Sequence, residues 1–234
     1  MTLRLRNIAF AIAFYSGSLV LVLLALPCVF LPGGAVIAMA KAWSRWHRFC
    51  TRTLLGIRIE VEGDMPQGQA LYAIKHESFF EAIDMPSFLD GAPIPFAKIE
   101  LLQIPLWGRA AARYGVIGVD RATGAKALRH MSRSAKLAKA SGRNLGIFPE
   151  GTRVAHGTQA PMQSGLYGIY KLIDLPIVPV AVDSGPLYQT STKRSGTITY
   201  RIGKPIPPGL ARAELESQVH KAINALNPGA SPAT

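Results

Sequence analysis

The first forty residues contain a long apolar stretch that distinguishes them from the rest of the chain. No charged residue lies between Arg6 and Lys41, and residues 8–26 are almost entirely apolar. As an α-helix this run is about 29 Å long at about 1.5 Å per residue. A membrane has a hydrocarbon core of roughly 30 Å. The pattern therefore predicts a segment that meets lipid rather than a helix buried in a soluble core.

A break rich in proline and glycine follows the apolar run (Pro27, Pro32, Gly33 and Gly34). Basic residues lie on both flanks (Arg4 and Arg6 before; Lys41, Arg45, Arg48 and Arg52 after). Because positive charge marks cytoplasmic flanks, we expect a hairpin that enters and leaves the membrane by one face. Trp43 and Trp46 would then lie at the membrane interface.

Two other interpretations of this segment remain open. A single spanning helix places basic residues on the wrong side at one end. A cleaved signal peptide has a possible site at residues 38–40, but the apolar run is longer than a usual signal sequence. The hairpin explains both flanks, so we prefer it.

From residue 56 the pattern alternates between strands and helices. Short apolar runs rich in Ile, Val and Tyr lie at 57–61, 70–74, 115–119, 145–148, 177–182 and 197–202. Helical patterns lie near 80–89, 99–113, 122–141, 164–173 and 211–226. This alternation predicts an α/β fold with a mixed, largely parallel sheet flanked by helices. We expect an anchoring segment over 1–55, a catalytic domain over 56–227 and a disordered tail over 228–234.

Composition supports contact with lipid and argues against nucleic acid. The net charge is +12 and hydrophobic residues make up 49% of the chain. No zinc-finger spacing or RNA-binding signature is present. Cys28 lies in the apolar stretch, so a disulfide with Cys50 is not expected. The basic helical pattern at 122–141 is typical of a solvated face, or of a face that meets anionic headgroups.

A histidine follows the strand predicted at 70–74, within the letters KHESFFE of residues 75–81. His76 therefore lies where α/β folds place ligand sites. Glu81 follows after four residues, and a turn into a helix can bring its carboxylate to the imidazole. A carboxylate orients a histidine base and stabilises its protonated form. Alone, this spacing is weak evidence, because a single histidine at a strand end is more often structural.

A second motif, FPEGTR at 148–153, follows the strand predicted at 145–148. Gly151 allows the backbone to turn and approach a ligand. Arg153 can bind a phosphate, although a turn with a Glu150–Arg153 ion pair is the alternative. Lys98 follows residues 95–97, and Arg121 follows the strand predicted at 115–119. Four strand ends that carry such groups favour a shared phosphate-binding rim.

The chain resembles the lysophosphatidic acid (1-acylglycerol-3-phosphate) acyltransferase family, in which four blocks occur in a fixed order. They are a His, four residues and an acid (His76, Glu81), a Gly-containing strand that ends in Arg (115–121), FPEGTR (148–153) and an apolar strand with a proline (177–182). The resemblance spans about residues 70–185. Two departures stand out, because the usual Asp of the first block is Glu81 and a lysine of the third-block loop is replaced by Gln163.

The resemblance implies roles for these residues. His76, oriented by Glu81 or by Asp84 one turn later, would deprotonate the acceptor hydroxyl, which attacks the thioester of acyl-CoA or acyl-carrier protein. A second set would bind the acceptor's phosphate and glycerol (Lys98, Arg121, Glu150, Gly151, Thr152 and Arg153). No metal, no cofactor and no covalent acyl-enzyme are implied.

The resemblance also implies a membrane location, at the cytoplasmic face of the inner membrane if the protein is bacterial. The expected substrates are lysophosphatidic acid and an acyl donor. The alternatives are another acceptor, such as a lyso-ornithine lipid, or a non-catalytic lipid-binding module. A serine hydrolase is disfavoured because the chain lacks G-x-S-x-G.

Overall fold

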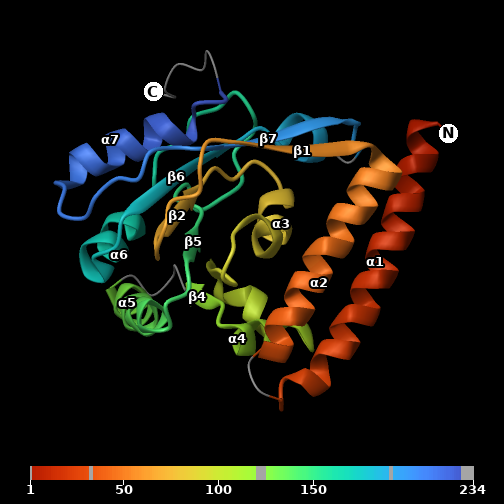
Figure 1. Ribbon diagram of the computed structural model, residues 1–234, viewed down its shortest axis with the longest axis horizontal. Helices are drawn as coiled ribbons and strands as arrows, with labels where there is room; N and C mark the ends of the chain where they lie inside the picture. Colours follow the sequence, from red (N-terminus) through yellow and green to blue (C-terminus); the bar gives the residue numbers. More distant parts are fainter. Residues whose placement is uncertain (1, 32–33, 120–124, 190–191, 228–234) are drawn as a thin grey trace.

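The computed structural model describes residues 2–31, 34–119, 125–189 and 192–227 (Figure 1). The disorder expected for the tail at 228–234 concerns residues outside these ranges, as does the position of Arg121.

A seven-stranded mixed sheet forms the centre of the molecule, in the order β1-β7-β6-β2-β5-β3-β4. The strands are β1 (Ile57–Glu62), β2 (Leu71–Ile74), β3 (Ile94–Lys98), β4 (Ile117–Val119), β5 (Leu145–Ile147), β6 (Ile177–Val182) and β7 (Gly196–Ile202). Strands β6, β2, β5, β3 and β4 are mutually parallel, whereas β7 is antiparallel to β6. The mixed, largely parallel sheet predicted from the sequence is confirmed.

Helices cover both faces of the sheet (Figure 1). They are α1 (Leu3–Cys28), α2 (Gly34–Cys50), α3 (Phe80–Phe88), α4 (Trp107–Tyr114), α5 (Ala125–Ala140), α6 (Gly165–Ile173) and α7 (Arg212–Ile223). One buried apolar cluster joins the sheet to α5, α6 and α7. A second cluster joins the other face to α1 and α3, with Trp43 and Trp46 of α2 packed against it. The catalytic region predicted at 56–227 is thus built on one continuous sheet.

Two elements differ from the sequence prediction because of prolines. Strand β3 was not among the apolar runs, since Pro95 interrupts its pattern, yet it pairs with both β5 and β4. The single helix expected over 99–113 is instead a 3-10 helix (Ile99–Gln103) followed by α4. Pro105 and the positive φ of Leu106 (67°) separate the two pieces.

The N-terminal segment is a helical hairpin, as predicted, but it lies along the domain. Helix α2 packs on both α1 and α3. At the hairpin tip, Arg113 of α4 donates hydrogen bonds to the carbonyls of Val29 (3.2 Å) and Leu31 (3.0 Å). The tip is therefore fastened to the domain rather than projecting from it.

The tryptophans of α2 contact α1. The indole of Trp43 donates to the Ser18 hydroxyl (2.9 Å), and that of Trp46 donates to the Ala13 carbonyl (3.2 Å). Both side chains thus join the two helices of the hairpin, and their place at a membrane interface stays a prediction. Only α1 is long and apolar enough to cross a membrane among the described helices, and just 17% of its most apolar window is buried.

Candidate active site

The predicted site residues gather at one edge of the sheet because parallel strands end there together. His76 follows β2, Glu150 follows the neighbouring β5, and Lys98 ends β3, the next strand along. Strand β4, which precedes Arg121, is next to β3. The carboxyl ends of parallel strands are where α/β folds place their ligand sites. The shared edge inferred from four strand ends is therefore present in the fold.

His76 is held by the loop that contains FPEGTR. Its backbone N–H donates to Glu150 Oε2 (3.1 Å), and its carbonyl accepts from the Val154 N–H (2.8 Å). Its ring stacks on Phe148, with 4.0 Å between the ring centroids. The first and third sequence blocks therefore form one unit, in which the loop fixes both the backbone and the ring plane of the histidine.

The Glu81 carboxylate lies beside the imidazole. His76 Nδ1 and Glu81 Oε2 are 3.6 Å apart, and Glu81 is buried. Glu81 stands in the first turn of α3 and reaches back to accept from the N–H groups of Glu77 (3.3 Å) and Ser78 (3.1 Å). Negative charge is favourable at a helix N-terminus. These contacts fix the carboxylate under the histidine.

Asp84, the alternative partner, is committed elsewhere. It accepts two hydrogen bonds from Arg48 (2.5 and 2.8 Å) and one from the Tyr200 hydroxyl (3.2 Å). Burial raises the pKa of the Asp84 carboxyl, and the bond to Arg48 opposes that shift. Asp84 joins α3 to α2, and of the two acids the one beside His76 is Glu81.

The Glu150 carboxylate is buried. Both of its oxygens are used within the protein, Oε1 by the Lys75 ammonium (2.5 Å) and Oε2 by the His76 N–H. Neither side chain of the Lys75–Glu150 pair is accessible to solvent. Lys75 also donates to Asn224 Oδ1 (2.9 Å), beyond the end of α7. These contacts give the Glu150 carboxylate a role in supporting His76, and its contact with substrate stays a prediction.

The remaining predicted residues are more open. Gly151 has a φ of 69°, the left-handed conformation that favours glycine, at the turn of the loop. Thr152 and Arg153 are exposed, and the Arg153 guanidinium lies 3.9 Å from the centroid of the Phe79 ring. Lys98 is also exposed. Arg153 and Lys98 are thus exposed basic residues at this edge of the sheet, where an anionic ligand can reach them.

Sequence reasoning missed Lys75, Glu77 and His156. Glu77 is buried, and its carboxylate accepts from His156 Nδ1 (3.0 Å) and from the Gly185 N–H (2.8 Å). Lys75 and Glu77 flank the predicted base in the sequence, but the side chains that they contact lie more than seventy residues away. Only the folded chain reveals them.

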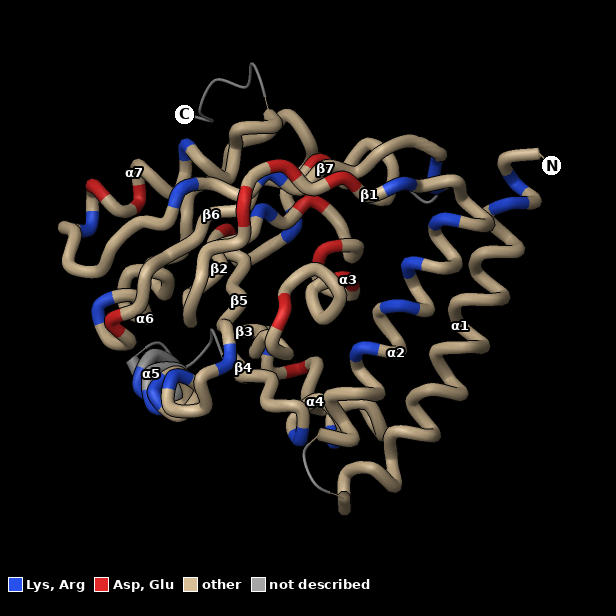
Figure 2. The backbone as a smooth tube through the Cα atoms, viewed as in Figure 1, with Lys and Arg blue, Asp and Glu red and all other residues tan. Residues whose placement is uncertain are grey.

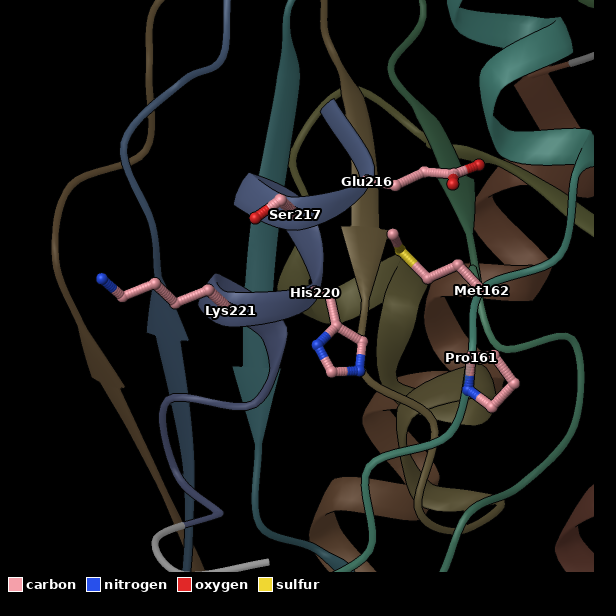
Figure 3. A pocket seen from close by; sticks show the side chains of 6 residues that line it. All are labelled: Pro161, Met162, Glu216, Ser217, His220 and Lys221. Carbon is pink, nitrogen blue, oxygen red and sulfur yellow. The ribbon is translucent and has the colours of Figure 1, made fainter. Parts of the chain in front are cut away.

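A shallow pocket opens away from this edge. It has a volume of about 410 Å³. Its lining comprises Pro161, Met162, Glu216, Ser217, His220 and Lys221. Figure 3 shows it between α7 and the segment at 161–162, with Lys221 pointing away from Met162. None of the predicted site residues lines it.

Within the described ranges no cluster of three metal-ligating side chains occurs.

The chain is similar in sequence to a known protein family and to several of its members. The family described as Acyltransferase matches residues 57–183. A 1-acyl-sn-glycerol-3-phosphate acyltransferase alpha of Homo sapiens is 32% identical over 205 residues, which cover 85% of this chain and 72% of the human protein. The 1-acyl-sn-glycerol-3-phosphate acyltransferase of Pseudomonas aeruginosa is 31% identical over 172 residues, or 70% and 65% of the two chains.

A second Pseudomonas aeruginosa protein, a lyso-ornithine lipid O-acyltransferase, is 28% identical and matches 82% of this chain and 81% of its own length. The crystal structure of a 1-acyl-sn-glycerophosphate acyltransferase from Thermotoga maritima superposes with a TM-score of 0.76 at 20% identity, covering 98% of this chain and all of the other. That similarity concerns the fold, including the hairpin.

Proposed function

The chain belongs to the acyltransferase family, and we propose that it is a 1-acylglycerol-3-phosphate O-acyltransferase. It would transfer an acyl chain from a thioester donor to the free hydroxyl of lysophosphatidic acid, and so produce phosphatidic acid for phospholipid synthesis. The observation that carries the proposal is His76, placed 3.6 Å from the buried Glu81 and held by the FPEGTR loop.

The proposed chemistry is general base catalysis. With Nδ1 turned toward Glu81, the other ring nitrogen, Nε2, takes the proton of the acceptor hydroxyl. The hydroxyl oxygen attacks the thioester carbon, the ester bond forms and the carbon–sulfur bond breaks. The thiolate then takes the proton from the imidazolium. Catalytic hydrogen bonds often tighten only in the substrate complex, so a separation of 3.6 Å is compatible with this role.

The acceptor's phosphate would be bound by cations of the same edge. Arg153 belongs to the loop that holds His76, and Lys98 ends β3, the strand next to β5. We include Arg121 from the sequence, with Gly151 and Thr152 at the loop turn. Glu150 has a positioning role in this proposal, because its carboxylate supports the His76 backbone from beneath.

The donor is acyl-CoA or acyl-carrier protein, and cleavage of the thioester supplies the driving force without a metal or cofactor. We place the protein on one face of a membrane, the cytoplasmic face in a bacterium. The outer side of α1 supports this location, because its apolar residues are exposed (Ile8, Ile12, Leu19, Val20, Leu23 and Leu24 among them). Since the hairpin tip is fastened to α4, α1 would lie in the membrane surface on its side rather than enter tip first.

The test is an acyl-transfer assay with the purified full-length protein. Lysophosphatidic acid and other lysolipids are offered with acyl-CoA or acyl-carrier protein, and thiol release is followed. We expect transfer to lysophosphatidic acid that is lost in His76→Ala while membrane binding is kept. Full activity of His76→Ala contradicts the mechanism, and inactivity of the wild type with both donors contradicts the function.

A second candidate keeps the enzyme class and changes the acceptor to a lyso-ornithine lipid. Two observations favour it. The relative of that name matches this chain over most of both lengths, and Gln163 stands where the resemblance leads us to expect a lysine. The same assay separates the two acceptors, because a lyso-ornithine lipid has no phosphate.

A further inference from the structure

A second histidine–carboxylate pair lies next to the proposed base. Glu77 directly follows His76 and is fully buried. His156 Nδ1 lies 3.0 Å from Glu77 Oε1 and 3.2 Å from Oε2. Neither residue takes part in the proposed proton transfer, so the pair must serve another purpose.

The pair joins the two segments that carry the site. Five contacts fasten residues 75–77 to the loop at 150–158: Lys75 with Glu150 and with the Thr158 carbonyl, His76 with Glu150, His76 with Val154, and Glu77 with His156. The Arg153 guanidinium itself lies over the ring of Phe79. The His156–Glu77 bond is thus one of three contacts, with those of Val154 and Thr158, that hold the loop on the C-terminal side of Arg153.

Glu77 is a buried carboxyl whose ionised form depends on its hydrogen-bond donors. Burial raises the pKa of the Glu77 carboxyl, and the nearby Glu81 acts in the same direction. The Gly185 N–H and His156 oppose that shift by hydrogen bonding to the ionised form. A buried carboxylate that loses such a donor is left with an unmet hydrogen bond. His156, by contrast, keeps about a third of its side chain exposed, so its removal disturbs little packing.

We propose that the Glu77–His156 pair is a positioning device that, together with the His76–Val154 hydrogen bond, sets the distance between the base His76 and the phosphate-binding Arg153. It thereby determines the preference for a phosphate-bearing acceptor over a neutral one. This inference rests on the proposed function. Reacting groups need close alignment, and small displacements of a positioned group commonly reduce rates by ten- to about a hundredfold.

The experiment compares two acceptors in the full-length protein, lysophosphatidic acid and monoacylglycerol, with the same acyl donor in mixed micelles. The ratio of their kcat/KM values measures the preference for phosphate. In His156→Ala we expect that ratio to fall about tenfold or more, mainly through a higher KM for lysophosphatidic acid. His156→Asn keeps an N–H near the position of Nδ1, and we expect it to retain most of the preference.

Two further variants separate positioning from folding. His220→Ala alters a histidine on α7, at the shallow pocket, and should leave the ratio unchanged. Glu77→Met, which removes the acceptor oxygens, should lower the ratio as His156→Ala does, and the double variant should be no worse than the worse single one, because both remove the same bond. A purely structural role would change the melting temperature and leave the ratio of the folded enzyme intact.

The outcomes distinguish this inference from the proposed function. A wild type that prefers lysophosphatidic acid, with a His156→Ala variant of equal preference, contradicts the positioning role alone. Additive losses in the double variant also contradict it. A wild type that acylates neither acceptor, or shows no preference for the phosphate, contradicts the proposed function and this inference with it.

Discussion

The Lys75 ammonium and the Glu150 carboxylate form an ion pair of 2.5 Å in which neither side chain is accessible to solvent. One residue precedes the proposed base and the other belongs to FPEGTR. The second oxygen of Glu150 holds the His76 N–H. The pair therefore links the stability of the domain to the placement of His76.

Removal of Lys75 should destabilise the protein strongly. Lys75→Met leaves the Glu150 charge buried without a partner, which costs about 3–5 kcal/mol in comparable pairs. We expect a fall of that size in the free energy of unfolding, measured by urea denaturation followed by tryptophan fluorescence. The double variant Lys75→Met/Glu150→Gln should recover much of the loss, because the buried charge is gone. A loss below about 1 kcal/mol in the single variant would show that Glu150 is not charged or not buried in solution.

Glu81 and Asp84 should respond differently to removal of their charge. Glu81→Gln should lower kcat by about 10²-fold or more, since it removes the carboxylate that faces the imidazole. Asp84→Asn should lower the free energy of unfolding by about 1–3 kcal/mol through the lost Arg48 bonds, with kcat changed only a few-fold. Steady-state kinetics and denaturation of both variants check this. The reverse pattern would make Asp84 the partner of His76.

The sequence contained enough information to place the fold and one edge of the site. Apolar runs located six of the seven strands, and the same runs placed His76 and FPEGTR at strand ends. Strand β3 escaped because Pro95 disrupts the pattern that marks a strand. The pattern of apolar residues in a strand indicates whether that strand is buried, but not which strands lie beside it. That the ends of β2 and β5 lie near each other was therefore inferred only from the polar residues that follow both strands.

The partners of buried charges could not be predicted in the same way. Glu150 was expected to contact the acceptor because the family resemblance implies that role. Its burial depends on Lys75, and that of Glu77 on His156, each a contact across more than seventy residues. Such pairings are set by the register of neighbouring strands, which a single sequence does not specify.

His47 should make the stability of the protein depend on pH. Burial among aromatic rings, with the charges of Arg48 and Lys193 as smaller causes, lowers the pKa of His47 from 6.5 to about 3. Its Nε2 lies 2.8 Å from the Tyr188 hydroxyl, and Nδ1 has no hydrogen-bond partner among the described residues.

Between about pH 6.5 and about 3 the unfolded chain carries a proton on this histidine and the folded chain does not. The free energy of unfolding therefore falls as the pH is lowered through that window, by up to about 1.4 kcal/mol per pH unit from this group. Urea denaturation of wild type and His47→Gln across the window isolates the effect, because all other groups are shared. Parallel pH profiles for the two proteins would contradict a buried, neutral His47.

Membrane binding should depend on α1 and not on the basic helix α5. Figure 2 shows α5, with its Lys and Arg residues, on the opposite side of the molecule from α1. A membrane surface that meets the outer side of α1 is thus remote from α5, which favours the solvated face over headgroup contact. Deletion of the hairpin is a poor test, because Phe10 and Phe14 of α1 are buried in the core.

Substitutions on the exposed sides of the two helices give the sharper experiment. The triple variant Ile8→Glu, Ile12→Glu and Leu19→Glu alters exposed residues of α1, and each loses about 1.5–3 kcal/mol of apolar burial in lipid. Binding to vesicles of zwitterionic and anionic phospholipid, measured by flotation, should fall more than a hundredfold. The matched triple variant Arg129→Glu, Arg133→Glu and Lys136→Glu alters exposed residues of α5 and should bind as the wild type does. If α5 met anionic headgroups, each basic residue would contribute about 1 kcal/mol, and the α5 variant would lose binding to anionic vesicles alone, which would contradict the proposed orientation.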